Sequence, residues 1–264
     1  MRVALSQMSS GHDVSANLVA ITRAARRAAA DGAELVVFPE AAMYGFGAPL
    51  GLVAEPLDGP FATSVQLLAR ELGVTLVVGM FTPAPDGRVL NTLLAAGPES
   101  VASYDKIHLF DAFGVRESET VAPGDSRRTI TVAGTTVGLA TCYDVRFPSL
   151  FVTNADAGAK VSVVCASWAG GPGKVEQWEL LGRARAADST TYVLACDQAL
   201  PPGGSAGPAP TGVGHSMVVD PFGHVLARLG EDEGLLVVDL DLTLVDQARD
   251  TLPVLRNRRD PIPG

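Results

Sequence analysis

The chain has 264 residues, of which 47% are hydrophobic and 19% charged, and its formal net charge is −9. This length and composition allow a large buried core. The negative charge and the absence of a long Lys/Arg cluster argue against a nucleic-acid partner. No apolar stretch approaches the length of a membrane span, so no membrane partner is expected.

The first half of the chain alternates predicted strands and helices. The predicted elements are strands over 2–8, 34–38, 74–81, 89–95 and 100–106 and helices over 16–30 and 60–72. Asp13 or Ser15 is a suitable N-cap for the first helix, and Gly73 is a suitable end for the second. A polar loop is predicted over 107–127.

The second half continues with hairpins as well as helix–strand units. We predict strands over 129–132, 136–141, 161–166, 191–197, 215–220, 225–229 and 235–240, and helices over 148–156, 175–188 and 242–249. Residues 200–212 form a Pro/Gly/Ala-rich loop, and the tail at 253–264 is predicted to be irregular. The mixture indicates an α/β fold with mixed sheets. No shift in composition marks a linker, so we expect one domain over 1–264.

Three cysteines bear on the compartment. Cys142, Cys165 and Cys196 are an odd number, and Met1 leads directly into a strand-like segment rather than a secretory signal. We therefore expect free thiols in a reducing cytoplasm. Cys165 and Cys196 lie within apolar strands and are interpreted as core residues.

Cys142 differs from the other two because it ends a predicted strand. An apolar strand leads to it, a polar turn follows, and Pro148 is placed for the first turn of a helix. A strand-to-helix turn of this kind resembles a nucleophile elbow, with Cys in place of Ser. The alternative is a small buried hydrophobe, which is what most free cysteines are.

Two further ionisable residues follow predicted strands in the same way. Glu40 comes after LVVF and Lys106 after VASYD. In open α/β sheets, sites form beyond the carboxyl ends of strands, so a carboxylate, an ammonium and the Cys142 thiol can meet there. Glu40 would activate the thiol as a base, protonate the departing ammonia and then activate water. Lys106 and the backbone N–H of Tyr143 would form the oxyanion hole.

Other constellations compete with this one. His108 or His215 could pair with Cys142 as in a Cys–His hydrolase, but His108 lies two residues past Lys106 and is interpreted as structural. A metal site is weaker still because no paired ligands occur at short spacing. Taken singly, a residue such as Glu40 is more often an ordinary strand end, and one such as Lys106 is more often a surface cation.

The motifs FPE at 38–40, DKIHLFD at 105–111 and CYDVRFP at 142–148, in this order, resemble the carbon–nitrogen hydrolase (nitrilase) superfamily. The resemblance extends over nearly the whole chain, through RVALSQM, APGD at 122–125 and ARAADSTTYVLACDQ at 184–198. It implies a four-layer αββα sandwich, usually a homodimer, with no metal and no organic cofactor.

The resemblance also implies a Glu–Lys–Cys triad, here Glu40, Lys106 and Cys142. The second glutamate of the family falls on Glu117, in a position to support Lys106 and the substrate. The implied reaction is amide hydrolysis through a Cys thioester, with release of ammonia.

The residues after the nucleophile narrow the branch. Tyr143-Asp144 replaces the Trp-Glu pair of true nitrilases, and the motif looks most like the amidases that include deaminated-glutathione amidase and omega-amidase. We therefore expect a small-molecule amide substrate, such as a 2-oxo-acid amide. Ser149 departs from the family's usual Glu and leaves the substrate open. Alternatives are hydrolysis of N-carbamoyl amino acids, aliphatic amides or nitriles, an acyltransferase, and a catalytically silent binding module.

Three residues are candidates for substrate contacts. Arg146 lies four residues past Cys142, where its guanidinium can pair with a substrate carboxylate. The alternative for Arg146 is an internal ion pair with Asp144 or Asp111. Tyr44 and Trp168 follow strand ends and are candidates to line the pocket, with core packing as the alternative for both.

Overall fold

The computed structural model describes residues 1–201, 203–204 and 209–259. One sheet has the order β15 (Gly234–Asp239), β1 (Arg2–Gln7), β2 (Leu35–Val37), β3 (Thr75–Pro83), β4 (Val89–Ala96) and β5 (Val101–Asp105), with β8 (Val121–Ala122) beside β4. The other has the order β14 (Val225–Arg228), β13 (Met217–Val219), β12 (Tyr192–Asp197), β11 (Val161–Ala166), β10 (Thr135–Thr141) and β9 (Thr129–Val132).

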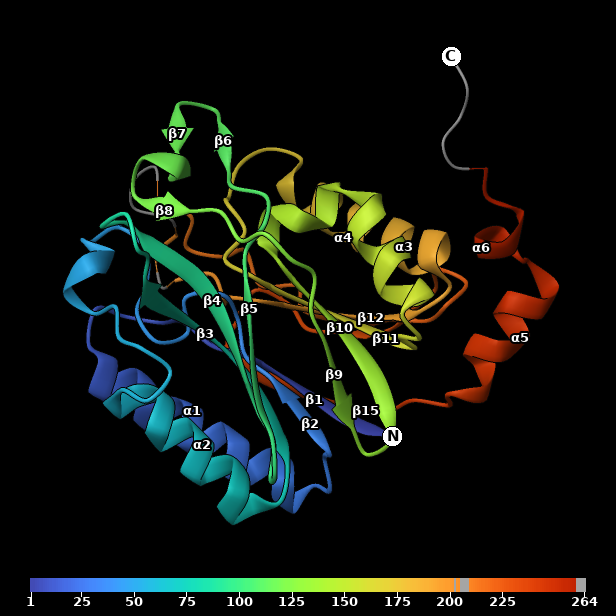
Figure 1. Ribbon diagram of the computed structural model, residues 1–264, viewed down its shortest axis with the longest axis horizontal. Coiled ribbons are helices and arrows are strands. Elements are labelled where there is room, and N and C mark those ends of the chain that lie inside the picture. The colour runs from blue at the N-terminus through green and yellow to red at the C-terminus, as the bar shows by residue number, and fades with distance from the viewer. Residues whose placement is uncertain (202, 205–208, 260–264) are drawn as a thin grey trace.

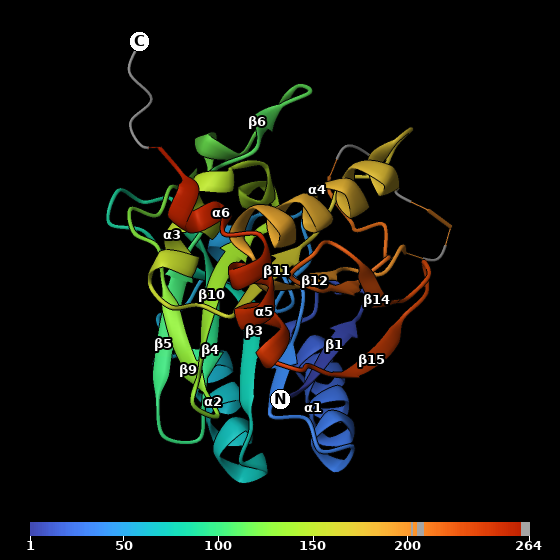
Figure 2. The ribbon, with the colours of Figure 1, turned by 90° about the vertical axis from the view of Figure 1, so that its right-hand side faces the viewer.

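The two sheets face each other and helices cover their outer sides (Figure 1). Helices α1 (Val14–Ala30) and α2 (Pro60–Leu72) lie on the first sheet, and α3 (Pro148–Asp156) and α4 (Lys174–Ser189) lie on the second. This is the expected αββα sandwich. The last helices, α5 (Thr243–Thr251) and α6 (Val254–Asn257), follow β15 and return alongside α4 (Figure 2).

Alternating side chains of the first sheet supply two separate apolar layers. Val3, Leu35 and Val77 join the core between the sheets, whereas Val36 and Leu76 join the core beneath α1 and α2. Because every second residue of a strand points to the same face, a strand buried on both sides must be apolar throughout. This explains the continuous hydrophobic runs from which the strands were predicted.

The helix ends follow the predicted signals. The Asp13 side chain accepts hydrogen bonds from the N–H groups of Ser15 and Ala16, and α1 therefore begins two residues before the predicted start. Gly73 ends α2 in the left-handed conformation, and Pro148 occupies the first turn of α3.

The segment 107–127, predicted to be a loop, has structure of its own. It forms a small hairpin, β6 (Asp111–Ala112) and β7 (Val115–Arg116), then a 3₁₀ turn over Glu117–Glu119 and the strand β8. Strands of two residues are too short for an alternating pattern, so the sequence does not predict them. The tail, predicted to be irregular, contains α6; its residues 260–264 lie outside the described residues, as do 202 and 205–208 of the loop at 200–212.

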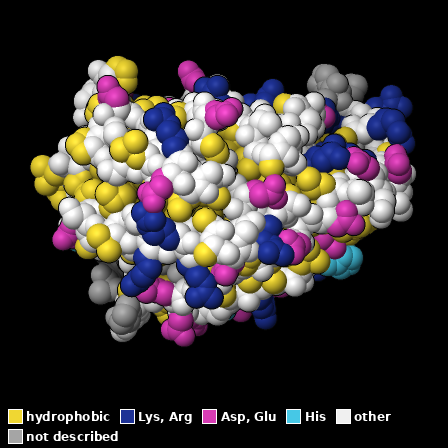
Figure 3. Space-filling model, turned by 90° about the horizontal axis from the view of Figure 1, so that it is seen from below, with side chains coloured by type: hydrophobic (Ala, Val, Ile, Leu, Met, Phe, Trp, Pro, Cys, Tyr) yellow, Lys and Arg dark blue, Asp and Glu magenta, His cyan; other side chains and the backbone are white. Residues whose placement is uncertain are grey.

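The face of the molecule seen in Figure 3 carries Lys and Arg side chains interspersed with Asp and Glu, and apolar side chains lie between them. Helices of the described part of the chain are all too short or too polar to cross a membrane.

Candidate active site

Three strand ends from the two sheets converge on one cavity. Strands β2 and β5 run in the same direction, since β3 is parallel to β2 and β4 is antiparallel to both β3 and β5. Glu40 follows β2, Lys106 follows β5, and Cys142 follows β10 of the facing sheet. All three line a cavity of about 570 Å³, together with Glu117, Tyr143 and Trp168. The three candidates chosen from strand ends are thus brought together.

Cys142 is held in a strained backbone conformation. Its φ is +47°, in the left-handed region that favours glycine, and it opens a 3₁₀ turn over Cys142–Arg146. The turn is fixed by Asp144, whose Oδ2 accepts the N–H of Thr141 at 2.8 Å. Arg185 of α4 donates to the carbonyl of Val145 at 3.0 Å. This strand–turn–helix geometry is the elbow predicted from the sequence.

The carboxylate of Glu40 is 1% exposed and is held on both oxygens. Its Oε1 accepts hydrogen bonds from Asn91 Nδ2 at 2.7 Å and from Lys106 Nζ at 3.1 Å. Its Oε2 accepts the backbone N–H of Ser167 at 2.8 Å. A carboxylate fixed in this way needs no reorientation to accept or return a proton.

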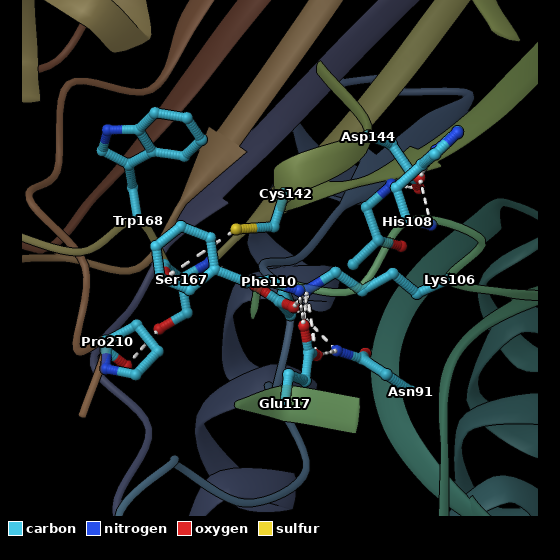
Figure 4. Close-up of polar contacts among 12 residues, drawn as sticks. Asn91, Lys106, His108, Phe110, Glu117, Cys142, Asp144, Ser167, Trp168 and Pro210 are labelled. Atoms are coloured by element: carbon cyan, nitrogen blue, oxygen red, sulfur yellow. Dashed lines mark hydrogen bonds and ion pairs between the residues drawn. The ribbon is translucent and has the colours of Figure 1, made fainter. Parts of the chain in front are cut away.

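Lys106 lies between two carboxylates. Besides Glu40, its ammonium contacts Glu117 Oε1 at 3.0 Å and Oε2 at 2.8 Å, and Figure 4 shows it pointing toward Glu117. Glu117 Oε2 also accepts the N–H of Phe110 at 2.7 Å. The predicted support of Lys106 by Glu117 corresponds to these contacts.

Burial and charge shift the pKa values of the three groups. Burial raises the pKa of Glu40, and the neighbouring Glu117 adds to this, while Lys106 opposes it. Burial alone would lower the pKa of Lys106, but Glu40 and Glu117 raise it well above its ordinary value, so the ammonium stays charged. Burial, followed by the charge of Glu40, raises the pKa of the Cys142 thiol well above its ordinary value. The resting site therefore holds a neutral thiol that needs a base.

A third carboxylate, that of Asp144, connects the end of β10 with the segment that follows β5. Asp144 is fully buried, and its oxygens accept from Tyr104 Oη at 2.6 Å and from the backbone N–H of His108 at 3.0 Å. His108 Nδ1 lies 2.7 Å from Asp144 Oδ1, and its ring stacks on Phe147 at 3.6 Å between centroids. In Figure 4, His108 lies beside Asp144. These contacts agree with the structural interpretation of His108.

His215, the other histidine candidate, contributes a backbone group. Its carbonyl oxygen accepts the indole N–H of Trp178 at 3.1 Å. The residues that line the cavity in the described part of the chain include neither His215 nor His108. The described residues contain no cluster of three His, Cys, Asp or Glu side chains arranged to hold a metal ion.

Two glycines allow neighbouring backbone segments to pack closely against the segments that carry Glu40 and Lys106. A Cβ on Gly79 of β3 would lie 2.5 Å from the Pro39 carbonyl oxygen and 2.8 Å from Glu40 Cα. A Cβ on Gly124 would lie 2.1 Å from the carbonyl oxygen of Asp105, the residue before Lys106. Only glycine fits at these positions without moving the Glu40 or Lys106 backbone.

Sequence reasoning missed two polar residues that hold the site. Asn91 of β4 donates to Glu40 and, at 3.4 Å, to Glu117. Asp197, at the end of β12, accepts the N–H of Trp168 at 2.8 Å and that of Val213 at 2.8 Å. Asp197 could have been found as another ionisable residue at a strand end, whereas Asn91 lies inside a strand and has no such signal.

The cavity contains two of the three predicted substrate contacts. Arg146 lines it, with Cζ 5.3 Å from the centroid of the Trp168 ring and 5.9 Å from that of Tyr143. Trp168 lines it as well. Tyr44 does not appear among the described lining residues; it is buried in the core beneath α1 and α2, with its ring 5.1 Å from that of His12. The core-packing alternative therefore holds for Tyr44.

The alternative for Arg146 was an internal ion pair. Its guanidinium instead donates to Gln177 Oε1 at 2.8 Å, while the carboxylate of Asp144 is used by Tyr104, His108 and Thr141. None of the ion pairs among the described residues includes Arg146. Its charge is thus available at the cavity wall.

Comparison with known proteins shows similarity over nearly the whole chain. The family model described as carbon-nitrogen hydrolase matches residues 2–250. A hydrolase of Mycobacterium tuberculosis (strain H37Rv) is 52% identical over 269 residues, covering 98% of this chain and 96% of that protein. Deaminated glutathione amidase of Escherichia coli O157:H7 is 35% identical, covering 88% and 87%. The human omega-amidase NIT2 is 33% identical, covering 98% and 95%.

Solved structures with the same fold are also similar. Nit3 of Saccharomyces cerevisiae, a member of branch 10 of the nitrilase superfamily, superposes with a TM-score of 0.86 at 28% identity, covering 99% of this chain and 97% of that one. A mutant of the amidase from Nesterenkonia sp. AN1 has a TM-score of 0.82 at 30% identity, covering 98% and 94%. In that structure the acetamide moiety of fluoroacetamide is covalently added at the active-site cysteine.

Proposed function

The chain belongs to the carbon–nitrogen hydrolase family, and on this premise we propose that Cys142 attacks a small carboxylated amide and forms a thioester that is then hydrolysed. The enzyme is an amidase that acts on carbon–nitrogen bonds other than peptide bonds. The substrate, the intermediate and the roles of Glu40, Lys106 and Cys142 are the content of the proposal.

In the first step the thiol sulfur of Cys142 forms a bond to the amide carbon, and its proton passes to Glu40. A base is required because the raised pKa of Cys142 leaves the thiol protonated near neutral pH. The raised pKa of Glu40 suits a group that must accept a proton and return it.

The negative charge that develops on the carbonyl oxygen needs donors. The Lys106 ammonium keeps its proton, and when the two oxygens of Glu117 share one N–H, the third of its three donors can serve the oxyanion. The N–H of Tyr143 belongs to the first turn of a 3₁₀ helix, where backbone donors lack intrahelical partners. Both groups are fixed before the substrate arrives, which is what makes such donors effective.

Glu40 then gives its proton to the leaving nitrogen, and the carbon–nitrogen bond breaks to release ammonia. The remaining thioester is attacked by water, whose proton Glu40 accepts. The tetrahedral intermediate collapses, the carbon–sulfur bond breaks, and Glu40 returns its proton to the departing sulfur, which leaves the carboxylic acid and the Cys142 thiol. The sum is one amide and one water converted to one acid and one ammonia, with the enzyme unchanged.

We infer that the substrate carries a carboxylate because Arg146 places a positive charge in the cavity. Its guanidinium lines the same cavity as Cys142 and is stacked near Trp168 and Tyr143. Arginine binds carboxylates bidentately, and such contacts are stronger in a partly buried site. Relatives named deaminated glutathione amidase and omega-amidase support an amide that also carries a carboxylate, of the 2-oxo-acid type.

The observation that carries the proposal is the convergence of a buried carboxylate, a buried ammonium and a strained cysteine on one cavity. We expect ammonia release from amides such as 2-oxoglutaramate and deaminated glutathione, and slower release from N-carbamoyl amino acids, aliphatic amides and nitriles. In the presence of hydroxylamine a thioester is diverted to a hydroxamate, whereas direct attack by water gives none. Ammonia release that survives Cys142→Ala would overturn the mechanism.

Arg146 is tested by comparing substrates. In Arg146→Ala, KM for carboxylated amides should rise about tenfold or more, with a small effect on neutral amides. Arg183→Ala is a matched control, because Arg183 lies on α4 and donates to the Gly223 carbonyl, away from the cavity lining. Equal changes for both classes of amide would rule out the clamp.

A further inference from the structure

Lys174, the first residue of α4, lines the cavity together with Arg146. The other cationic residues in the described lining are Lys106 and Arg116, and Arg116 is paired with Glu119 at 3.7 Å. The chain has three lysines, Lys106, Lys160 and Lys174. Lys106 is bound to Glu40 and Glu117, and Lys160 is paired with Asp246 at 2.8 Å. Lys174 contacts the face of Phe113, with Nζ 4.4 Å from the ring centroid. Ion pairs within the described residues do not include Lys174.

One tryptophan and one helix turn connect the two cations. Trp168 donates its indole N–H to the Lys174 carbonyl at 2.9 Å, and its ring lies beneath the Arg146 guanidinium. Arg146 is anchored to Gln177, which lies three residues after Lys174 and hence on the same side of α4. Arg146 and Lys174 are both half-buried. Both positive charges thus line the same cavity, and neither forms an ion pair with a carboxylate among the described residues.

Placing two such charges together has an energetic cost. Burial, and next the charge of Arg146, lowers the pKa of Lys174. Lys174 contacts an aromatic ring and Arg146 contacts the neutral amide of Gln177. Neither partner carries a negative charge that would cancel the repulsion between the two cations. An anionic group bound between the two cations would remove it, and would gain two charge-assisted contacts.

We propose that Lys174 is a specificity-determining residue that forms, with Arg146, a two-cation subsite for a carboxylate at the end of the acyl chain remote from the scissile amide. The inference rests on the proposed function for the position of the amide at Cys142. The two acidic side chains that line the cavity, Glu40 and Glu117, are both engaged by Lys106, so they do not compete for the subsite.

The remaining cavity wall determines which acyl chain of the substrate fits between the amide at Cys142 and the carboxylate at the cations. Apolar side chains make up much of its wall, including Phe46, Leu50, Phe110 and Val115. An acyl chain with an apolar middle, an amide at Cys142 and one carboxylate at the cations matches this distribution. This distribution fits the carboxylated amide of the proposed function, and the new element is that Lys174 selects it against neutral amides of the same length.

The test compares glutaramate with pentanamide, which have the same number of chain carbons and differ in a terminal carboxylate. In Lys174→Met, which keeps the apolar stem, the ratio of kcat/KM for glutaramate to that for pentanamide should fall about tenfold. Lys174→Arg should restore most of the ratio. Lys160→Met, which removes a lysine outside the cavity lining, should leave the ratio unchanged. An equal change for the two amides in Lys174→Met would overturn the proposal.

Binding separates this proposal from the proposed function. In the Cys142→Ala background, calorimetry measures the affinity for glutaramate without turnover, and adding Lys174→Met should weaken it about tenfold. Glutaramate that binds in this charge-dependent way but is not hydrolysed by the intact enzyme would refute the proposed reaction and leave the subsite standing. Binding that Lys174→Met does not weaken would refute the subsite, whatever the reaction.

Discussion

The Oε2 atom of Glu40, which follows a strand of the first sheet, accepts the backbone N–H of Ser167, which follows β11 of the second sheet, at 2.8 Å. Ser167 O is also the partner of the Cys142 sulfur, at 4.0 Å (Figure 4). One residue therefore contacts both the proposed base and the proposed nucleophile. The relative position of base and nucleophile thus depends on how the two sheets pack.

Gly79→Ala is expected to reduce activity far more than stability. The added Cβ would meet Pro39 O and Glu40 Cα at less than 3 Å, so the Glu40 backbone must shift. A misplacement of about 1 Å at the proposed base would cost about 100-fold in kcat. Steady-state rates of ammonia release give the loss, and urea unfolding gives the change in free energy of unfolding.

The matched control for this substitution is Gly230→Ala. Gly230 has no heavy atom within 4 Å of an added Cβ, so the same change in side chain meets open space. We expect its activity to remain within about twofold of the unmodified enzyme. Full activity in Gly79→Ala would mean that the position of Glu40 does not depend on β3.

The strand ends explain why the convergence of three ionisable residues on one cavity could be predicted from sequence. Glu40, Lys106 and Cys142 each follow a short apolar run, which is a local signal, and the family motifs indicate that the three belong together. Tyr44 shares the same local signal but points into the core. Whether a residue beyond a strand faces the cavity depends on the turn that follows, and for Tyr44 that turn is not readable from composition.

Asn91 and Gly79 show what the sequence leaves out. Asn91 and Gly79 lie inside strands whose register places them next to Glu40, and register across a sheet has no local signature. The hairpin β6–β7 was missed because its strands contain two residues each. Contacts over a long sequence separation, such as Ser167 with Glu40, become visible only when both sheets are assembled.

Asp144→Asn is expected to destabilise the fold and the site together. Asp144 is fully buried and accepts from Tyr104 Oη, Thr141 N and two nitrogens of His108. An amide nitrogen in place of one oxygen would face these donors, at a cost of about 2–4 kcal/mol in free energy of unfolding. Urea unfolding measures this. Asp246→Asn, which breaks an exposed pair with Lys160, should cost less than about 1 kcal/mol.

Asp197 makes a prediction for stability against pH. Burial raises its pKa from 3.8 to about 8 in the folded protein. Between these values the folded chain holds a proton that the unfolded chain has released, so the contribution of Asp197 to the free energy of unfolding falls as pH rises. In Asp197→Asn that dependence is removed, and the fall in Tm between pH 5 and pH 8 should be shallower, as calorimetric scans can measure. An unchanged slope would show that Asp197 does not titrate in this range.

Glu117→Gln should move the whole pH–rate profile toward lower pH. The negative charge of Glu117 raises the pKa of Glu40, of Lys106 and of Cys142. Without it, Glu40 ionises at lower pH, so the acid limb shifts down. Lys106 also loses its proton at lower pH, so the alkaline limb shifts down as well. We expect kcat at the optimum to fall about 10- to 100-fold, because the amide no longer holds the ammonium electrostatically.

The neighbouring Glu119→Gln provides the control for that substitution. Glu119 is exposed, and its carboxylate is paired with Arg116 at 3.7 Å, not with Lys106. Its profile should coincide with that of the unmodified enzyme. A merely structural role for Glu117 would lower kcat without moving the limbs. Limbs that move apart, or toward higher pH, would contradict the coupling of Glu117 to both Glu40 and Lys106, since a single lost negative charge must lower both pKa values.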